Sequence, residues 1–129
     1  MEEITLNVNW LAVIVGFVVA FLVGWVWYLP SLPIGKRWIE GVGMDPASPP
    51  KPSVTPMVWQ LIGTFLLAWL VGVTAANNAL LTIILAAFAV AALTIATGQF
   101  SRKSSFASFA EGGYVIIMVV IMIIFQGIF

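Results

Sequence analysis

Four long apolar stretches dominate the chain, and polar or charged residues separate them. In the first stretch, residues 10–29, no charged residue occurs over 20 positions. As a helix this stretch would be about 30 Å long, which is the thickness of the hydrocarbon core of a bilayer. The pattern therefore predicts a membrane-spanning helix over residues 10–29.

The next charge-free stretch, residues 52–101, is 50 residues long. One helix of that length would extend about 75 Å, more than twice the bilayer core, so the chain has to reverse direction within it. Asn77 and Asn78 favour a turn, because asparagine tolerates the left-handed backbone conformation and bonds to nearby backbone. The stretch therefore divides into predicted spans at residues 56–76 and 80–97.

A last apolar stretch gives a predicted span at residues 110–129. The chain is 62% hydrophobic and 8% charged, whereas a soluble domain is usually about 45–50% apolar and about 25% charged. A water-soluble domain of 129 residues has too little interior to bury so much apolar surface. We expect an all-α integral membrane protein, with a four-transmembrane-helix bundle as one domain over residues 1–129.

The loop after the first span, residues 30–55, is rich in proline, and all seven prolines of the chain lie in it or at its edges. Ile34, Trp38 and Val42 recur at four-residue spacing and predict a short amphipathic helix on the membrane surface. The rest of the loop predicts an extended linker, and its Pro-x-x-Pro spacings allow a polyproline ligand as the weaker alternative. Thr55 is the expected N-cap of the second span.

The basic residues lie in only two of the predicted loops. These residues are Lys36, Arg37, Lys51, Arg102 and Lys103. Basic loops stay in the cytoplasm according to the positive-inside rule. We therefore expect loops 30–55 and 98–109 to be cytoplasmic and both termini to be extracytoplasmic.

Aromatic and basic residues crowd together where the first span ends. They are Trp25, Trp27, Tyr28, Lys36, Arg37 and Trp38. Tryptophan and tyrosine rings prefer the headgroup level of a bilayer, with the apolar body inward and the polar edge outward. We interpret the group as interfacial anchors that contact membrane lipid, and a cage that binds a ligand is the alternative.

Small residues at four-residue spacing mark a packing face on each of the first two predicted spans. They are Gly16, Ala20, Gly24, Ala68, Gly72 and Ala76. Small side chains let helices approach closely in lipid. The pattern allows contacts within the bundle or between copies of the chain, and the sequence does not distinguish them.

Glu111 is the one carboxylate that adjoins the last three spans, and Ser108 precedes it by three positions. Ser-x-x-Glu is the pattern of a capping box, in which the serine hydroxyl accepts from the backbone N–H of the glutamate and the glutamate bonds back to the serine N–H. We expect this box at Ser108 and Glu111, with Arg102 and Lys103 close enough to add an ion pair. A proton or cation site at Glu111 is the alternative.

Several classes of chemistry lack the residues that they need. The chain has no cysteine and no histidine, which removes disulfides, the commonest zinc and haem ligands and the usual general base. Five basic residues balance five acidic ones, so no general attraction to nucleic acid is expected. No charged residue lies at mid-depth in any predicted span. We expect no enzymatic activity, no cofactor or metal, and no nucleic-acid partner.

Four short motifs resemble an uncharacterised bacterial membrane-protein family, catalogued as domain of unknown function 1761. They are Asn9-Trp10, Trp27-Tyr28-Leu29-Pro30, Gly35-Lys36-Arg37-Trp38 and Gly112-Gly113-Tyr114. This chain has Ile34 where the family usually has an aromatic residue before the loop glycine. The resemblance implies four spans in the inner (plasma) membrane of a bacterium, and it implies no particular activity.

Two functional hypotheses follow. An accessory or assembly subunit, packed against another membrane complex or as a homo-oligomer, fits the apolar spans, the small-residue faces and the lack of catalytic residues. A small oligomeric transporter or channel is the alternative, because four helices in about this length resemble the small multidrug exporters. Those exporters rely on a membrane-embedded glutamate in the first helix, and the first span here has no carboxylate. A lipid-binding module that uses the basic loops is a third option, although the positive-inside rule already explains those cations.

Overall fold

The structure is a computed structural model that describes residues 2–45, 47 and 54–129. The described residues form the long helices α2 (Trp10–Trp27), α4 (Val54–Ala76), α5 (Leu80–Phe100) and α6 (Ser105–Ile128) and the short helices α1 (Glu2–Thr5) and α3 (Pro33–Gly41). All four long helices are long and apolar enough to cross a membrane. The predicted all-α fold with four spans is confirmed. Of the predicted linker at residues 44–56, residues 46 and 48–53 lie outside the described residues, and residues 54–56 belong to α4.

The helix boundaries differ from the predictions mainly at the polar ends. Helix α6 begins at Ser105, five residues before the predicted span, because Ser104 caps it there. Helix α5 continues to Phe100, beyond the predicted end at residue 97. Thr55 lies within α4, which begins at Val54, so its prediction as the N-cap residue is wrong. The predicted turn is confirmed by Asn78, whose φ of 55° is left-handed.

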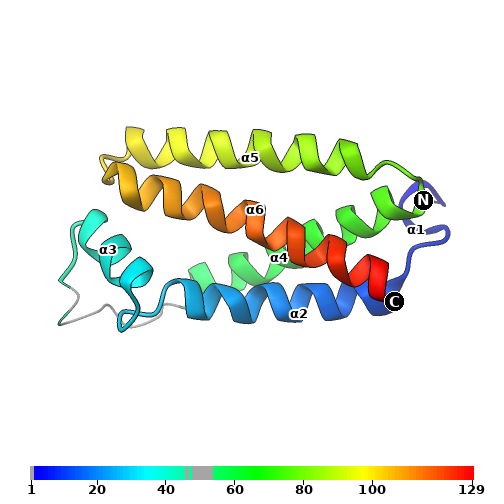
Figure 1. Cartoon of the computed structure of the whole chain (residues 1–129), viewed down its shortest axis with the longest axis horizontal. Helices are drawn as coiled ribbons and strands as arrows, with labels where there is room; N and C mark the ends of the chain where they lie inside the picture. Colours follow the sequence, from blue (N-terminus) through cyan, green and yellow to red (C-terminus); the bar gives the residue numbers. More distant parts are fainter. Residues whose placement is uncertain (1, 46, 48–53) are drawn as a thin grey trace.

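Helix α6 is the central helix of the bundle. In Figure 1, α2 and α5 run along opposite edges, α6 passes diagonally between them, and α4 crosses behind. Helix α6 contacts α2, α3, α4 and α5, and a larger share of it is buried than of any other span. Helix α3 and the turn between α5 and α6 lie at one end of the bundle, which we call the loop end, and both termini lie at the other (Figure 1).

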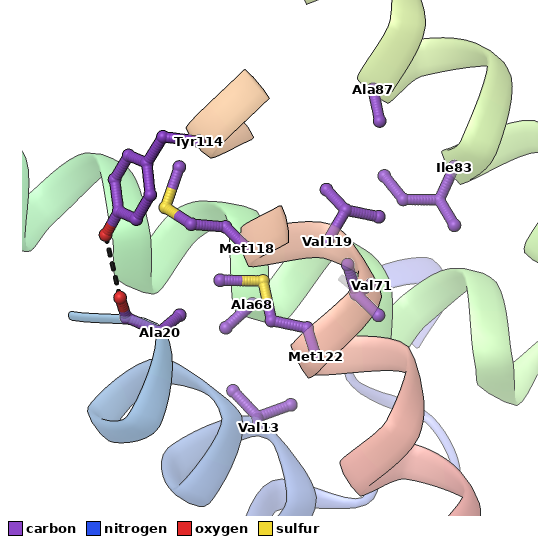
Figure 2. Close-up of a cluster of buried hydrophobic side chains, with 10 residues drawn as sticks. All are labelled: Val13, Ala20, Ala68, Val71, Ile83, Ala87, Tyr114, Met118, Val119 and Met122. Carbon is purple, nitrogen blue, oxygen red and sulfur yellow. Dashed lines mark hydrogen bonds between the residues drawn. The ribbon is translucent and has the colours of Figure 1, made fainter. Parts of the chain in front are cut away.

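The core gathers around three side chains of α6, namely Met118, Val119 and Met122 (Figure 2). The residues that join them in the core are Val13, Ala20, Ala68, Val71, Ile83, Ala87 and Tyr114. Lipid tails are as apolar as these side chains, so close packing and hydrogen bonds stabilise such a core more than apolar burial does. The methionines suit this position because their flexible side chains fill irregular gaps.

The small-residue face of α2 packs against α6 inside the bundle. A Cβ atom on Gly16 would lie 3.3 Å from the Met122 Cα, and one on Gly24 would lie 2.7 Å from the Tyr114 Cζ. Between them, Ala20 is fully buried, and its carbonyl oxygen accepts a hydrogen bond of 2.7 Å from the Tyr114 hydroxyl (Figure 2). This face therefore serves a contact within the chain and not one between copies.

The small-residue face of α4 packs against α2 over the half of α4 that lies farthest from the loop end. Ala68 is buried, and a Cβ atom on Gly72 would lie 2.6 Å from Val13 Cγ2 of α2. Ala76, at the end of the helix, is only half-buried. Close approach of α2 and α4 therefore depends on the missing side chain at Gly72.

Candidate functional site

Polar and aromatic side chains surround Glu111 at the loop end. The Glu111 carboxylate accepts hydrogen bonds from Lys103 Nζ at 3.0 and 2.8 Å and from Trp38 Nε1 at 2.9 Å. The side chain of Glu111 is 14% exposed and that of Lys103 is 32% exposed, so the ion pair is partly shielded from solvent. We call Trp38, Lys103, Glu111 and the neighbouring Tyr28 the Glu111 cluster. The expected ion pair with Lys103 is confirmed.

Three segments that are far apart along the chain bring these groups together. Lys103 lies on the turn between α5 and α6, directly after Arg102, whose φ of 63° is left-handed and reverses the chain. Trp38 lies on α3, and α3 is held to the start of α6 because the Ser104 N–H donates to the Gly41 carbonyl at 2.8 Å. The Glu111 cluster therefore joins α3, the turn between α5 and α6, and α6 itself. The first two lie in the two loops that are predicted to be cytoplasmic.

The predicted capping box at Ser108 and Glu111 is wrong. The N-cap of α6 is Ser104, whose Oγ accepts from the Ala107 N–H at 3.0 Å. Ser108 lies one turn inside the helix, is fully buried, and its Oγ has no hydrogen-bond partner among the described residues. Ser104 and Ser108 lie one turn apart, and Ser104 is the one that caps the helix. Ser104 also donates its backbone N–H to the Gly41 carbonyl of α3. The Glu111 side chain is left to bond Lys103 and Trp38.

Trp27 and Trp38 direct their polar edges toward the protein. The Trp27 Nε1–H donates to the Ala110 carbonyl at 3.0 Å, and the Trp38 Nε1–H donates to Glu111. The anchor interpretation expected these N–H groups to point outward to lipid headgroups. The two indoles instead donate them within the protein, so that part of the interpretation is wrong for Trp27 and Trp38. Trp25 is 54% exposed, and Lys36 and Arg37 are also exposed. For these three residues, contact with membrane lipid stays a prediction.

Tyr28 connects the end of α2 with both α3 and α6. Its ring centroid lies 4.7 Å from that of Trp38 and 5.7 Å from that of Tyr114. Burial raises the pKa of the Tyr28 phenol well above its usual value near 10, and the nearby Glu111 carboxylate raises that pKa further. The Tyr28 phenol therefore stays neutral at physiological pH.

Gly35 allows α3 to pack against the end of α2. A Cβ atom there would collide with the Leu29 carbonyl oxygen and would lie 2.7 Å from the Tyr28 carbonyl carbon. These are backbone atoms, which cannot move aside as a side chain can. The buried face of α3 is formed by Gly35 and Ile39, whereas Ile34 of the predicted apolar face is 36% exposed. The short helix is confirmed, and its inward face is shifted by one residue.

Chemically, the Glu111 cluster contains a single carboxylate that is already supplied with donors. Hydrogen bonds to a charged group are each worth about 1.5–3 kcal/mol, so the cluster is suited to holding the loop end together. Within the described residues there is no group of three or more acidic residues that could hold a metal. The alternative of a proton or cation site at Glu111 would require Lys103 to move away from the carboxylate.

A family model described as "Protein of unknown function (DUF1761)" matches residues 11–127. The chain belongs to this family. No curated protein and no solved structure matches the chain. Within this DUF1761 chain, three of the four motifs behind the resemblance meet at the loop end, where Trp27-Tyr28, Gly35 with Trp38, and Tyr114 pack together.

The fourth motif, Asn9-Trp10, lies at the opposite end of this DUF1761 protein. Asn9 is the N-cap of α2, and its Oδ1 accepts from the Ala12 N–H at 3.2 Å. The Trp10 ring lies 5.4 Å from that of Trp69 on α4. The motif thus has a structural role in starting α2 and joining it to α4.

The hydrogen bond from Trp38 to Glu111 was not predicted from the sequence. The available signal was an indole on the apolar side of an amphipathic helix, which indicated a contact but not its partner.

Proposed function

We propose that this protein is an accessory or assembly subunit of a membrane complex, and that its partner packs on the first half of α4. The supporting observation is that no residue from 54 to 63 is buried. The second half of the same helix contributes Thr64, Ala68, Val71, Gly72 and Thr74 to the interior. A span that is packed along only half its length leaves room for a helix from another subunit.

Two neighbouring positions on this half of α4 fit a helix–helix contact. A Cβ atom added to Gly63 would meet no described atom within 4 Å, so another backbone can approach there. Gln60, three residues earlier, is exposed and donates one amide hydrogen to Thr64 Oγ1 at 3.2 Å. Among the described residues, the Gln60 carbonyl oxygen and second amide hydrogen have no hydrogen-bond partner. Both are therefore free to bond a helix of another subunit. Small residues beside a polar amide are typical of helix interfaces in membranes.

The proposed location is the plasma membrane of a bacterium, with both basic loops in the cytoplasm and both termini outside. The positive-inside rule supports this orientation. It is also supported by the positions of α3, which contains Lys36 and Arg37, and of the turn between α5 and α6, because both lie at the end of the bundle opposite the termini (Figure 1). The docking half of α4 then lies in the cytoplasmic leaflet.

The test compares two glycines that have open space around them. Membranes are extracted into native-lipid particles, and the mass of the particle's protein content is measured against the 13.9 kDa chain. We expect the parent to be part of a larger assembly and Gly63→Leu to be released from it, because the new side chain occupies the contact. Gly127→Leu is the matched control, since a Cβ on Gly127 also meets no described atom within 4 Å.

A monomeric parent, or an assembly that survives Gly63→Leu as well as it survives Gly127→Leu, would contradict the proposal. A defined homo-oligomer that carries a solute across liposomes would instead favour the alternative, a small transporter or channel. That alternative has less support, because Glu111, a carboxylate near the start of α6, is held by Lys103 and Trp38.

A further inference from the structure

An open hollow of about 280 Å³ lies between the end of α2 and the start of α3. Its walls are formed by Val23, Val26, Trp27, Leu32, Pro33 and Ile34. No charged side chain is part of this lining, so water in the hollow would find few hydrogen-bond partners. The hollow lies where the first span leaves the membrane, which brings hydrocarbon within reach of it.

Arg37 lies on α3 three residues after Ile34, and side chains at this spacing are neighbours on a helix. Its guanidinium carbon lies 3.9 Å from the centre of the Phe106 ring of α6, so a cation–π contact orients the group. Among the described residues the salt bridge at the loop end is that of Lys103 with Glu111, and Arg37 has no carboxylate partner there. Its N–H donors are therefore free for an external anion.

We propose that the hollow binds an acyl chain of an anionic phospholipid whose phosphate group is held by Arg37. The apolar hollow suits the acyl chain of such a lipid, and the guanidinium without a carboxylate partner suits its phosphate. In a membrane the acyl chain lies deeper than the phosphate, and the hollow lies closer to the first span than Arg37 does. Arginine suits this role because its planar donors bind two phosphate oxygens at once. The neighbouring Lys36 is exposed, but it lines a separate hollow together with Glu40 and Asp45. The site rests on α2 and α3, so it is independent of the partner proposed for α4.

The inference separates Arg37 from the other cations at the loop end. Lys103 is occupied by Glu111. Arg102 lies on the turn after α5, which contributes no residue to the hollow, whereas Arg37 lies on α3, which contributes Pro33 and Ile34. A general attraction of basic loops to an anionic membrane would treat all of them alike, since it depends on charge near the surface. A site at Arg37 predicts that one cation matters more than its neighbours.

The experiment is native mass spectrometry of the purified protein with equal amounts of phosphatidylglycerol and phosphatidylcholine. We expect one phosphatidylglycerol to be retained in preference to phosphatidylcholine. Arg37→Gln should weaken phosphatidylglycerol binding about fivefold, the equivalent of one basic residue near an anionic surface. Arg102→Asn is the matched control, because it also removes one cation and asparagine tolerates the left-handed φ of that position. It should leave the preference unchanged.

The apolar half of the site has its own test. Ile34→Trp should fill the hollow and lower retention of both lipids, and Val26→Trp fills it from the α2 side if the first variant does not melt cooperatively. Inorganic phosphate should not displace the lipid, because it has no acyl chain. Equal retention of the two lipids by the parent, equal effects of Arg37→Gln and Arg102→Asn, or normal retention in both tryptophan variants would each overturn the site.

Discussion

Breaking the ion pair between Lys103 and Glu111 should destabilise the loop end of the bundle by an amount that follows from its partial burial. The two Nζ–O distances are 3.0 and 2.8 Å, and the side chains are 32% and 14% exposed. Exposed pairs contribute about 0–1 kcal/mol, whereas removing one partner of a fully buried pair costs about 3–5 kcal/mol. For this intermediate case we expect a coupling energy of about 1–2 kcal/mol between the two residues.

The variants divide this effect between the charge and the hydrogen bonds. Glu111→Gln removes the charge and keeps an oxygen acceptor for Trp38, so it should cost about 1–2 kcal/mol. Glu111→Ala also leaves the Trp38 N–H without its acceptor and should cost about 1 kcal/mol more. Lys103→Met removes the cation while keeping most of the side-chain length, and completes the double-mutant cycle with Glu111→Gln.

The assay is unfolding in mixed micelles with increasing dodecyl sulfate, followed by tryptophan fluorescence. The control cycle pairs Lys103→Met with Glu3→Gln, because Glu3 lies on α1 at the opposite end of the bundle. Distant sites should be additive within about 0.5 kcal/mol. If the cycle with Glu111 is as additive as the control, the ion pair does not hold the loop end together and the reasoning is refuted.

Three further outcomes are expected. Ser104→Ala should lose about 1 kcal/mol because it removes the cap of α6, whereas Ser108→Ala should lose nothing, since the Ser108 Oγ has no partner among the described residues; thermal melts that reverse this order would restore the capping box. Gly35→Ala should cost about 1–3 kcal/mol in the same assay, because its Cβ would collide with the backbone of Leu29, and a melt equal to the parent would contradict that packing. A reporter fused after Phe129 should read as extracytoplasmic, and a cytoplasmic reading would refute the orientation.

Much of the architecture could be predicted from local rules that act on each segment separately. The spans follow from the length of the charge-free stretches relative to the bilayer, and the turn follows from the tolerance of Asn78 for a left-handed φ. The short helix α3 follows from the spacing of Ile34, Trp38 and Val42. The starts of α6 and α4 could not be predicted as well, because hydropathy does not register where a cap such as Ser104 begins a helix.

The partners of individual side chains at the loop end could be predicted only in part. Glu111 has a plausible local partner in Ser108 and a second one in Lys103, both close in sequence, and local rules favoured the serine. Its third neighbour, Trp38, is 73 positions away. The local pattern on α3 places the Trp38 indole on one face of that helix, but it does not identify Glu111 as the partner. The contact exists because Gly35 lets α3 fold back over the end of α2.

The sequence by itself determined that this is a four-helix membrane protein, since length and hydropathy relative to the bilayer are properties of each segment. Only the tertiary structure decided which side of each helix faces its neighbours. In lipid every face of a span can be apolar, so the hydrophobic pattern does not record the rotation of a helix about its axis. Close contacts record it instead: the phenol of Tyr114 fits beside Gly24 and donates to the carbonyl of Ala20, and the small-residue face of α2 is thereby turned toward α6.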